Sequence, residues 1–165
     1  MDKLVGYVSL QREESDAVFN QTAIYAMRAL AYLATMPEGS SVRSSDLSAE
    51  TGVPVHYLSK IMRRMVIAKL VTSRRGHGGG FSLARPPGEI TFAQLLSAVD
   101  ACPSSDQCAL GNRSCSDRRP CLLHAAWSRG EEAITRWTEE TTLADIDGTA
   151  PGSALLGLFA PSIEE

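Results

Sequence analysis

The chain has 165 residues, a hydrophobic content of 44% and a formal net charge of −3, values that fit one domain with an appended element and exclude a wholly disordered chain. No apolar run approaches the roughly 18 residues that a membrane span needs, and the first 16 residues lack the apolar stretch of a secretion signal, so we expect a cytoplasmic protein without membrane contact. The acidic average also argues against a nucleic-acid-binding protein, since such domains are usually basic.

Residues 1–18 show no clear periodicity, and we expect them to form an N-terminal extension. A helical pattern starts after Asn20, a residue suited to capping a helix, and runs to about Ala34. Pro37 and Gly39 then break the pattern. The apolar face of this predicted helix comprises Ala23, Ala26, Met27, Leu30, Ala31 and Leu33.

Two short helices are predicted next. The first has Ser44 or Ser45 as its expected N-cap and Gly52 as its stop, and Pro54 fits the first turn of the second. The residues expected to face inward are Leu47 and Ala49 on the first helix and Leu58, Ile61, Met62 and Met65 on the second. Such a pair, joined by a tight turn and presenting cations from its second helix, is typical of a helix-turn-helix.

Two extended runs follow the helix pair, at 70–73 and 81–84, and the segment between them begins with two arginines and contains four glycines. Glycine supplies positive φ angles and allows a close backbone approach, so this segment predicts a β-hairpin. Thr91 and Gln94 then form a capping box for a helix that runs to about Val99. A helix-turn-helix followed by a basic, glycine-rich hairpin predicts a winged helix, a mainly α fold with a small β-hairpin wing.

The predicted winged helix has a charge pattern suited to DNA despite the acidic average. Residues 43–85 carry eight Lys or Arg against two acids, so their net charge of +6 leaves −9 for the rest of the chain. We expect the second helix of the pair to enter the major groove and the hairpin to reach a phosphate or the minor groove. The candidate DNA contacts are His56, Ser59, Lys60, Arg63 and Arg64 on the helix and Arg74, Arg75 and Gly76 on the hairpin.

Charge alone is explained equally well by a solvated basic surface with no partner. A nucleotide site is disfavoured, because the glycines of the hairpin match neither of the common phosphate-binding loop motifs. We also find no nucleophile–base pair that would indicate a hydrolase, so no enzymatic activity and no small-molecule substrate are expected.

All four cysteines, Cys102, Cys108, Cys115 and Cys121, lie within twenty residues. Disulfides are disfavoured in a reducing compartment, and structural zinc sites usually have shorter spacings than these gaps of five, six and five residues. A loosely spaced thiolate loop fits an iron–sulfur cluster better. His124 follows Cys121 by three residues and is either a further ligand or an ordinary residue of the next helix.

A long helix is predicted from about residue 122 to 140, with an apolar stripe formed by Leu123, Trp127, Ile134 and Trp137. This stripe packs either on the helix's own domain or on a second copy of the chain, and the pattern does not distinguish the two. The segment 147–165 is rich in Gly, Pro and Ala, and we expect a flexible tail there.

Between Phe19 and about Ile146 the chain resembles the IscR/NsrR family of bacterial winged-helix repressors. The matching stretches are Tyr25-Ala26, Tyr57-Leu58, Leu70-Val71, the run from Arg75 to Leu83, Ile90-Thr91, Ala98-Val99-Asp100, the segment from Cys108 to Trp127 and the run from Thr142 to Ile146. The resemblance implies a homodimer in which the long helix packs against its mate. It also implies that a cluster in the cysteine loop tunes DNA affinity.

The resemblance implies a ligand set as well. IscR-like members bind a [2Fe–2S] cluster through three cysteines and a histidine, which correspond here to Cys108, Cys115, Cys121 and His124. NsrR-like members take the fourth ligand from an acidic residue on the first helix. That position aligns with Ile24, which cannot bind a metal, so the histidine version is favoured.

Several residues depart from the family pattern. The gap between Cys108 and Cys115 is one residue longer than expected, and the extra Cys102 would allow either a replacement for the histidine or a [4Fe–4S] form. Lys69 stands where the family usually has a glycine that ends the recognition helix. Val18 stands where a basic residue is frequent, which would remove one phosphate contact.

The predicted organisation is an N-terminal extension (1–18), a winged helix-turn-helix domain (19–100), a cysteine-rich cluster loop (101–121), a dimerisation helix with a short terminal element (122–146) and a tail (147–165). The predicted function is a dimeric transcriptional regulator, acting as a repressor on a palindromic operator in double-stranded DNA. Its cluster would sense iron–sulfur supply, redox state or nitric oxide. The alternative is a redox or metal carrier whose basic face binds a protein partner.

Overall fold

The computed structural model describes residues 19–76, 78–102, 108, 110 and 115–146. Its elements are α1 (Gln21–Ala34), α2 (Ser44–Thr51), α3 (Val55–Ile67), β1 (Val71–Arg74), β2 (Gly80–Leu83), the 3-10 turn η1 (Pro87–Glu89), α4 (Phe92–Ala98), α5 (His124–Glu140) and the 3-10 turn η2 (Leu143–Asp145). The predicted extension 1–18 and tail 147–165 lie outside the described residues. No helix of the described part is long and apolar enough to span a bilayer.

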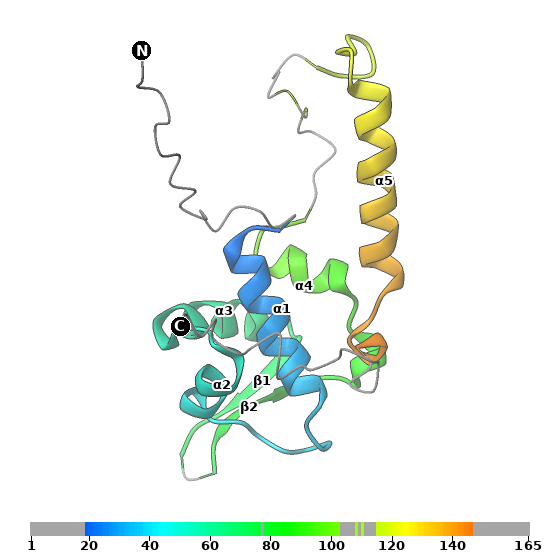
Figure 1. Cartoon of the computed structure of the whole chain (residues 1–165). Helices are drawn as coiled ribbons and strands as arrows, with labels where there is room; N and C mark the ends of the chain where they lie inside the picture. The colour runs from blue at the N-terminus through cyan, green and yellow to red at the C-terminus, as the bar shows by residue number, and fades with distance from the viewer. Residues whose placement is uncertain (1–18, 77, 103–107, 109, 111–114, 147–165) are drawn as a thin grey trace, which may run out of the picture.

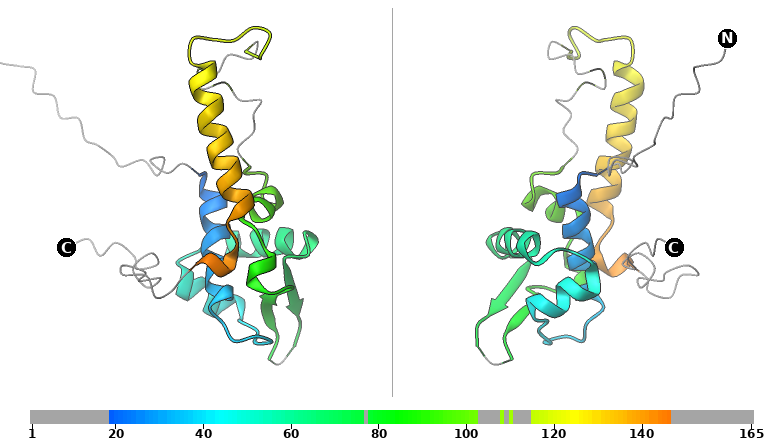
Figure 2. Two further views of the ribbon diagram at one scale, coloured as in Figure 1. Left: turned by 90° about the vertical axis from the view of Figure 1, so that its right-hand side faces the viewer. Right: turned by 60° about the vertical axis from the view of Figure 1, so that its left-hand side comes forward.

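The elements form a packed body and one projecting helix (Figures 1 and 2). Within the body, α1 packs against α2, α3, α4 and β2. α5 rises from this body and carries the cysteine segment at its far end, whereas the tip of the hairpin lies at the opposite end of the molecule (Figure 1). The predicted mainly α fold with a small β-hairpin wing is confirmed.

Two predicted helix starts are confirmed in their side-chain detail. Asn20 caps α1, because its Oδ1 accepts a hydrogen bond from the backbone N–H of Ala23 at 2.9 Å. Thr91 and Gln94 form the expected capping box at the start of α4, each side chain accepting from the other residue's backbone. Both caps satisfy backbone donors that a helix start would otherwise leave without partners.

The core is built around α1. Ala23, Ala26 and Ala29 are fully buried, and their small side chains let the neighbouring elements approach the helix closely. The large, fully buried side chains come from the four helices of the winged helix and from the segments that connect its elements: Leu30, Leu47, Val53, Leu58, Ile61, Met62, Met65, Leu70, Ile90, Leu95 and Leu96. Helix α3 is thereby anchored along one whole side.

The predicted N-cap of α2, Ser44 or Ser45, is wrong. Ser44 is already helical, and the N-cap position belongs to Arg43, which makes no side-chain cap hydrogen bond. The hydroxyl of Ser45 donates to Asp46 Oδ1 at 2.9 Å instead of accepting from the backbone. Asp46 lies in the first turn, where a negative charge stabilises a helix start without a cap.

The turn between α2 and α3 forms around Gly52, whose φ of 66° confirms the predicted left-handed stop. Leu47 is buried as predicted, but Ala49 is exposed. Thr51 takes the inward place, because its hydroxyl bonds the Leu47 carbonyl and therefore has a partner inside the core. Pro54 occupies the N-cap position of α3, one residue before its predicted place in the first turn.

Helix α3 ends at Ile67, and Lys69, two residues later, has a φ of 58°. The backbone N–H of Leu70 donates to the Met65 carbonyl at 3.0 Å, the pattern of a Schellman motif. The lysine that replaces the family's glycine therefore lies in the left-handed region. Asp100, with φ 55°, follows the end of α4 in the same way.

The wing is an antiparallel hairpin in which Arg74 pairs with Gly80, and each strand is shifted by one residue from its predicted bounds. Val42, just before α2, pairs with the outer edge of β2: its N–H donates to the Phe81 carbonyl at 2.9 Å, and the Phe81 N–H donates back at 2.8 Å. A Cβ on Gly80 would collide with the Val42 backbone, so this approach requires glycine.

The C-terminal end of α5 is fastened to the start of α4. The Phe92 N–H donates to the Thr141 carbonyl at 3.0 Å, and the Leu143 N–H donates to the Ile90 carbonyl at 2.9 Å. Leu143 is buried, and the ring centroid of Trp137 lies 5.3 Å from that of Phe92. These contacts fix the direction in which α5 leaves the body.

The rest of α5 is little covered. It begins at His124, two residues after the predicted start, and Thr138 is the one buried residue of this fully described helix. Leu122, just before it, is 88% exposed, and Trp127 is 41% exposed. The predicted apolar stripe thus packs on the body at its C-terminal end and reaches solvent elsewhere.

Candidate DNA-binding face and metal centre

Helix α3 has one apolar side in the core and one polar side in solvent. The residues predicted to contact DNA from it, His56, Ser59, Lys60, Arg63 and Arg64, are all exposed. A helix anchored in this way, with cations on its free side, can lie in the major groove and contact phosphates and base edges.

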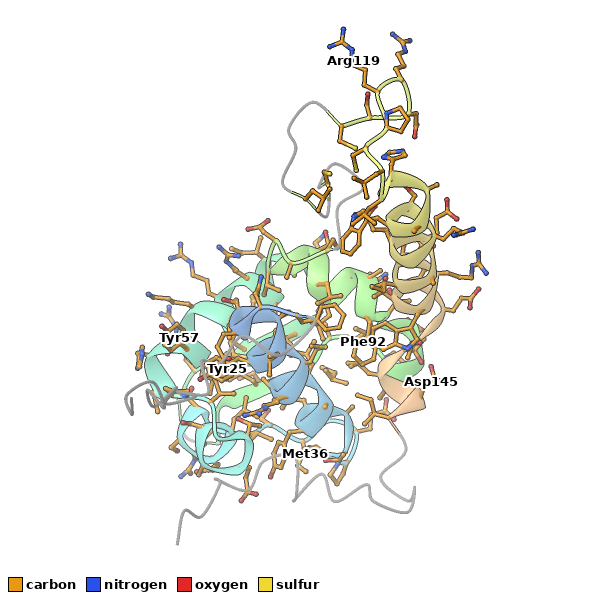
Figure 3. All side chains as sticks on the ribbon, turned by 45° about the horizontal axis from the view of Figure 1, so that its top comes forward. Tyr25, Met36, Tyr57, Phe92, Arg119 and Asp145 are labelled. Atoms are coloured by element: carbon orange, nitrogen blue, oxygen red, sulfur yellow. The ribbon has the colours of Figure 1, made fainter. Side chains whose placement is uncertain are left out.

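Aromatic rings support the start of this face. The ring centroid of His56 lies 4.5 Å from that of Tyr57, and the ring centroid of Tyr57 lies 5.7 Å from that of Tyr25 on α1. Tyr25 and Tyr57 are labelled in Figure 3. The hydroxyl of Ser59 donates to the Val55 carbonyl at 3.0 Å, which leaves its acceptor lone pairs available to a ligand. The polar groups in the first turns of α3 are therefore held in place by packing of the neighbouring aromatic rings.

Arg64 differs from the other predicted contacts because it has an acidic partner. Its Nη1 lies 3.0 Å from Asp100 Oδ2, and both side chains are exposed. An exposed ion pair contributes only about 0–1 kcal/mol, so this contact links α3 to the end of α4 without holding Arg64 firmly. Lys60 and Arg63 have no acidic partner among the residues that the structure describes.

Two apolar side chains on α3 were missed as candidate site residues. Val55 is 52% exposed and Ile67 is 71% exposed. Ile67 follows Arg63 by four residues and Lys60 by seven, so the three share one face of the helix. Apolar side chains contact the methyl group of thymine in the major groove. The helical spacing of residues 60, 63 and 67 is the signal that could have revealed Ile67.

The hairpin brings its predicted contacts together at one exposed turn. Arg74, Arg75 and Gly76 are all exposed, and Gly76 has a φ of 94° that only glycine adopts readily. This turn lies at the end of the molecule remote from the cysteine segment (Figure 2). The structure therefore separates the candidate DNA contacts from the candidate metal ligands.

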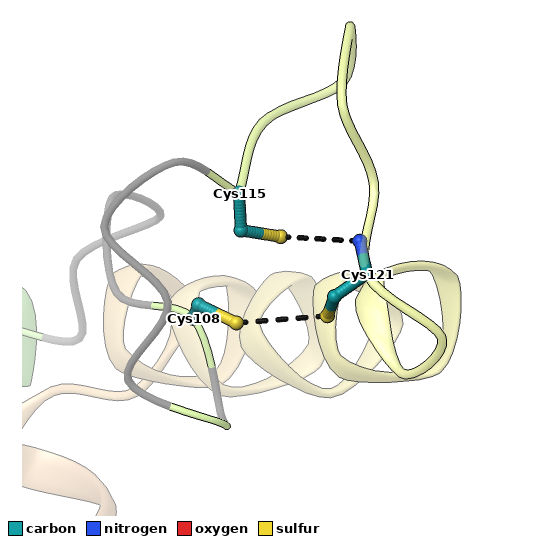
Figure 4. A group of neighbouring side chains, drawn as sticks. All are labelled: Cys108, Cys115 and Cys121. Carbon is teal, nitrogen blue, oxygen red and sulfur yellow. Dashed lines mark hydrogen bonds between the residues drawn. The ribbon is translucent and has the colours of Figure 1, made fainter.

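Three of the predicted metal ligands converge beside the first turn of α5 (Figure 4). The Sγ atoms of Cys108, Cys115 and Cys121 lie within 4.8 Å of one another, and all three residues are half-buried. The Sγ atoms of Cys108 and Cys121 are 3.6 Å apart. Two thiolates on one tetrahedral metal lie about 3.8 Å apart when each metal–sulfur bond is about 2.3 Å, so this pair fits a shared metal.

His124 extends the donor set from the first position of α5. Its Nδ1 lies 3.3 Å from Cys115 Sγ, and its Nε2 lies 2.9 Å from Asp117 Oδ1. The structure therefore brings Cys108, Cys115 and Cys121 together and places the imidazole of His124 beside Cys115, outside the group of three mutually close sulfurs. Asp117 was not predicted from the sequence, and nothing in its spacing distinguishes it from the other polar residues of the loop.

The chemistry of this donor set fits a metal or an iron–sulfur cluster. The backbone N–H of Cys121 donates to Cys115 Sγ at 3.4 Å and lowers the pKa of that thiol. Burial and the neighbouring thiols of Cys121 and Cys108 outweigh this effect, so the pKa of Cys115 lies above its usual value. Thiolates with one imidazole are ligands for zinc and for mixed Cys/His clusters.

Cys102 lies apart from this group. Its thiol donates to the Ala93 carbonyl of α4 at 3.7 Å, and burial raises its pKa. The structure thus places the fourth cysteine against the winged helix, outside the group of three sulfurs that lie within 4.8 Å of one another.

Comparison with known proteins places this geometry among transcriptional regulators. The Rrf2 family model, described as an iron-dependent transcriptional regulator, matches residues 19–147. An HTH-type transcriptional regulator of Mycobacterium tuberculosis strain H37Rv is 37% identical over 129 residues, which cover 78% of this chain and 80% of that protein. The HTH-type transcriptional regulator IscR of Klebsiella pneumoniae is 32% identical over 122 residues, 74% of each chain.

Solved structures share the same fold. CymR, the global cysteine regulator of B. subtilis, superposes with a TM-score of 0.67 at 19% identity, over 80% of this chain and 97% of its own. IscR of T. potens superposes with a TM-score of 0.61 at 23% identity, over 77% of this chain and 83% of its own. At such identities these likenesses establish the winged-helix fold.

Proposed function

The chain is a member of the Rrf2 family of transcriptional regulators, HTH-type DNA-binding proteins and not enzymes, and from this premise we propose that an iron–sulfur cluster tunes its DNA affinity. The proposed ligands are Cys108, Cys115, Cys121 and His124, and the proposed cluster is [2Fe–2S]. The observation that carries the proposal is the convergence of three thiols and one imidazole at the start of α5. The protein would act as a repressor that responds to iron–sulfur supply, redox state or nitric oxide.

The proposal divides DNA binding, cluster binding and dimerisation among three segments of the chain. We assign DNA binding to residues 19–100, the cluster to 101–121 and dimerisation to 122–146. The two sequence relatives compared above are named as HTH-type transcriptional regulators, which favours a regulator over the alternative of a redox or metal carrier.

The DNA-binding segment supports contact through two separate groups of cations. Lys60 and Arg63 lie on the free side of α3, and Arg74 and Arg75 lie at the hairpin turn. Cations on the helix meet the edges of the major groove, and arginines of the wing meet phosphates or the minor groove beside it. Phosphate contacts position the protein, and base contacts from α3 provide the sequence preference.

The cluster, when bound, supplies a centre that is lost or changed by oxidation, iron shortage or nitric oxide. The chain's part is to bring ligands from a loop and a helix together. Cys108, Cys115 and Cys121 belong to the loop, and His124 begins α5. Because the ligands must be deprotonated and held together, binding is coupled to the folding of this loop. Ordering of the loop would also order the first turn of α5. Since α5 is the proposed dimerisation helix, cluster binding would in this way affect the dimer.

The exposed stripe of α5 supports a homodimer. Trp127 and Trp137 of α5 and Leu122 and Leu123 just before it are exposed in the single chain, and neighbouring large exposed apolar side chains indicate an interface. A twofold dimer would present two copies of α3 to a palindromic operator. The cluster, at one end of α5, would change the relative placement of the two recognition helices.

The cluster is tested by anaerobic purification with visible absorption spectra and with iron, sulfide and zinc analysis. We expect iron and sulfide with visible absorption in the wild type, and loss of both in Cys108→Ser, Cys115→Ser and Cys121→Ser. Cys102→Ser is the matched control and should keep the cluster. Zinc without sulfide, or unchanged absorption in all three variants, would contradict the proposal.

The DNA-binding role is tested by affinity for operator DNA as a function of salt. About six phosphate contacts should lower the affinity roughly a thousandfold between about 50 and 200 mM salt. Lys60→Ala and Arg63→Ala should each weaken binding and reduce the salt slope by about 1 if they contact phosphates. Arg136→Ala, an exposed cation on α5, should leave affinity and slope unchanged.

A further inference from the structure

The turn at residues 116–119 carries an acidic side chain back onto the proposed histidine ligand. The Ser116 N–H donates to the Arg119 carbonyl at 3.3 Å, and the Arg119 N–H donates to the Ser116 carbonyl at 2.9 Å, so the turn is closed by its own backbone. Asp117 lies inside this turn, and its Oδ1 is 2.9 Å from His124 Nε2. The closed turn therefore holds the carboxylate on the side of the imidazole away from the sulfurs.

The two nitrogens of His124 face different groups. A carboxylate accepts hydrogen bonds and cannot donate one, so the nitrogen that faces Asp117 must carry a hydrogen. In the neutral ring the other nitrogen, Nδ1, then has a free lone pair. That lone pair is directed at the sulfur group, since Nδ1 lies 3.3 Å from Cys115 Sγ.

We propose that Asp117 is a positioning residue for the metal centre: its carboxylate holds His124 in the Nε2–H form, with Nδ1 as the ligand atom. This inference rests on the proposed function and specifies how its fourth ligand is oriented. Carboxylates that accept from the second nitrogen of a metal-bound histidine orient the ring and raise its basicity. In this chain the orienting group comes from the same loop as the thiolates, two residues after Cys115.

Because the contact between Asp117 and His124 is exposed, the proposed positioning role can be distinguished from a role in stabilising the fold. The Asp117 side chain is fully exposed, whereas that of His124 is 23% exposed. An exposed pair contributes little to folding. Substitution of Asp117 should therefore leave the fold intact and act on the histidine alone.

Two substitutions separate orientation from charge. In Asp117→Asn the amide oxygen can still accept from Nε2–H, whereas Asp117→Ala has no acceptor. Removal of such an outer partner typically costs about 10–100-fold in metal affinity, and the exposure of this one favours the lower end. We expect cluster lifetime under a chelator to fall about tenfold in Asp117→Ala and to remain near the wild-type value in Asp117→Asn. Arg118→Ala, the next residue of the same turn, is the matched control and should change nothing.

The metal-free protein provides a second test that does not depend on a cluster. The ¹⁵N chemical shifts of the His124 ring, assigned with His124→Gln, should report the Nε2–H form in the wild type and a mixture in Asp117→Ala. A wild-type Nδ1–H form, or equal cluster lifetimes in the wild type and Asp117→Ala, would overturn the proposal. Equal losses in Asp117→Asn and Asp117→Ala would also overturn it, because they would assign the effect to charge.

Different results would show that the proposed iron–sulfur cluster itself is wrong. If Cys115→Ser keeps the visible absorption, the cluster assignment is wrong, whatever the Asp117 variants do. If Cys115→Ser loses the absorption and Asp117→Ala matches the wild type in both measurements, the cluster stands and Asp117 has no positioning role.

Discussion

Along α1, α3 and α4 every turn places a side chain in the common core, whereas the seventeen residues of α5 bury only Thr138. The winged helix is therefore specified by its own apolar packing. Helix α5 instead has contacts at its two ends: His124 lies beside Cys115 at one end, and the chain after the helix pairs with the backbone at the start of α4 at the other.

The difference indicates which region we expect to change when the proposed cluster is bound or lost. A region with a complete core keeps its shape without metal or partner, whereas one held by few contacts opens at low free-energy cost. We therefore expect the metal-free protein to retain a folded winged helix and to differ from the loaded protein around residues 101–127. Four experiments with substituted proteins test this division.

The largest effect should come from the core of the winged helix. Leu30 is fully buried, and Leu30→Ala should lower the free energy of unfolding by about 2–5 kcal/mol, because it removes buried apolar surface and leaves a cavity. Leu110→Ala makes the same change at a 55% exposed position outside the proposed dimer interface and should stay within about 0.5 kcal/mol. Urea unfolding of the metal-free protein measures both. Similar losses at the two sites would remove the distinction between the regions.

The second largest effect is expected on dimer formation and not on folding. Trp127→Ala should weaken the proposed dimer by about 2 kcal/mol or more, roughly thirtyfold, as expected for a large aromatic side chain central to an interface. Sedimentation equilibrium measures the change, and Arg129→Ala, exposed two residues away on α5, is the control. A dimer that is indifferent to Trp127 would place the interface elsewhere.

A pair of glycine substitutions should act with opposite signs in the two regions. Gly80→Ala forces a Cβ against the Val42 backbone and should destabilise the protein by about 1–3 kcal/mol. Gly130 lies in α5 with open space around its Cβ position, so Gly130→Ala should stabilise the helix by up to about 1 kcal/mol. Thermal unfolding of both variants gives the signs, and a loss of stability in Gly130→Ala would show that α5 is more closely packed than described.

The smallest effect lies where the two regions join. Asp145 accepts hydrogen bonds from the backbone and the side chain of Thr142, and these lower its pKa. A lowered pKa favours the charged form in the fold, so its stabilisation is present above about pH 4 and is lost as the pH falls through the lowered pKa. The stability difference between wild type and Asp145→Asn should follow this course. A difference that does not vary with pH would assign the effect to packing.

Local signals predicted the winged helix well. The cap at Asn20, the capping box at Thr91 and Gln94 and the left-handed Gly52 each depend on residues close in sequence, and all three are present. The N-cap of α2 could not be predicted in this way, because the hydroxyl of Ser45 had a competing partner in Asp46.

The candidate metal centre depends on contacts between segments, so the spacing of residues in the sequence predicted less of its geometry than of the winged helix. The clustering of four cysteines indicated a metal site but did not indicate that Cys102 would lie against α4. The orientation of His124 by Asp117 depends on a turn whose closure no local motif revealed. The exposure of the Trp127 stripe likewise required the structure, since the pattern fitted either an internal or an external partner.

The pairing of Val42 with Phe81 has a consequence for the thermodynamics of DNA recognition. Because β2 is bonded to the chain segment that leads into α2, the wing is attached to the helix-turn-helix before any DNA arrives. Binding then need not order the strands, and the conformational entropy that the protein loses is mainly that of the arginine side chains at the turn and of the cations on α3. A larger share of the favourable contact free energy therefore remains as DNA affinity than in a protein whose wing folds only on binding.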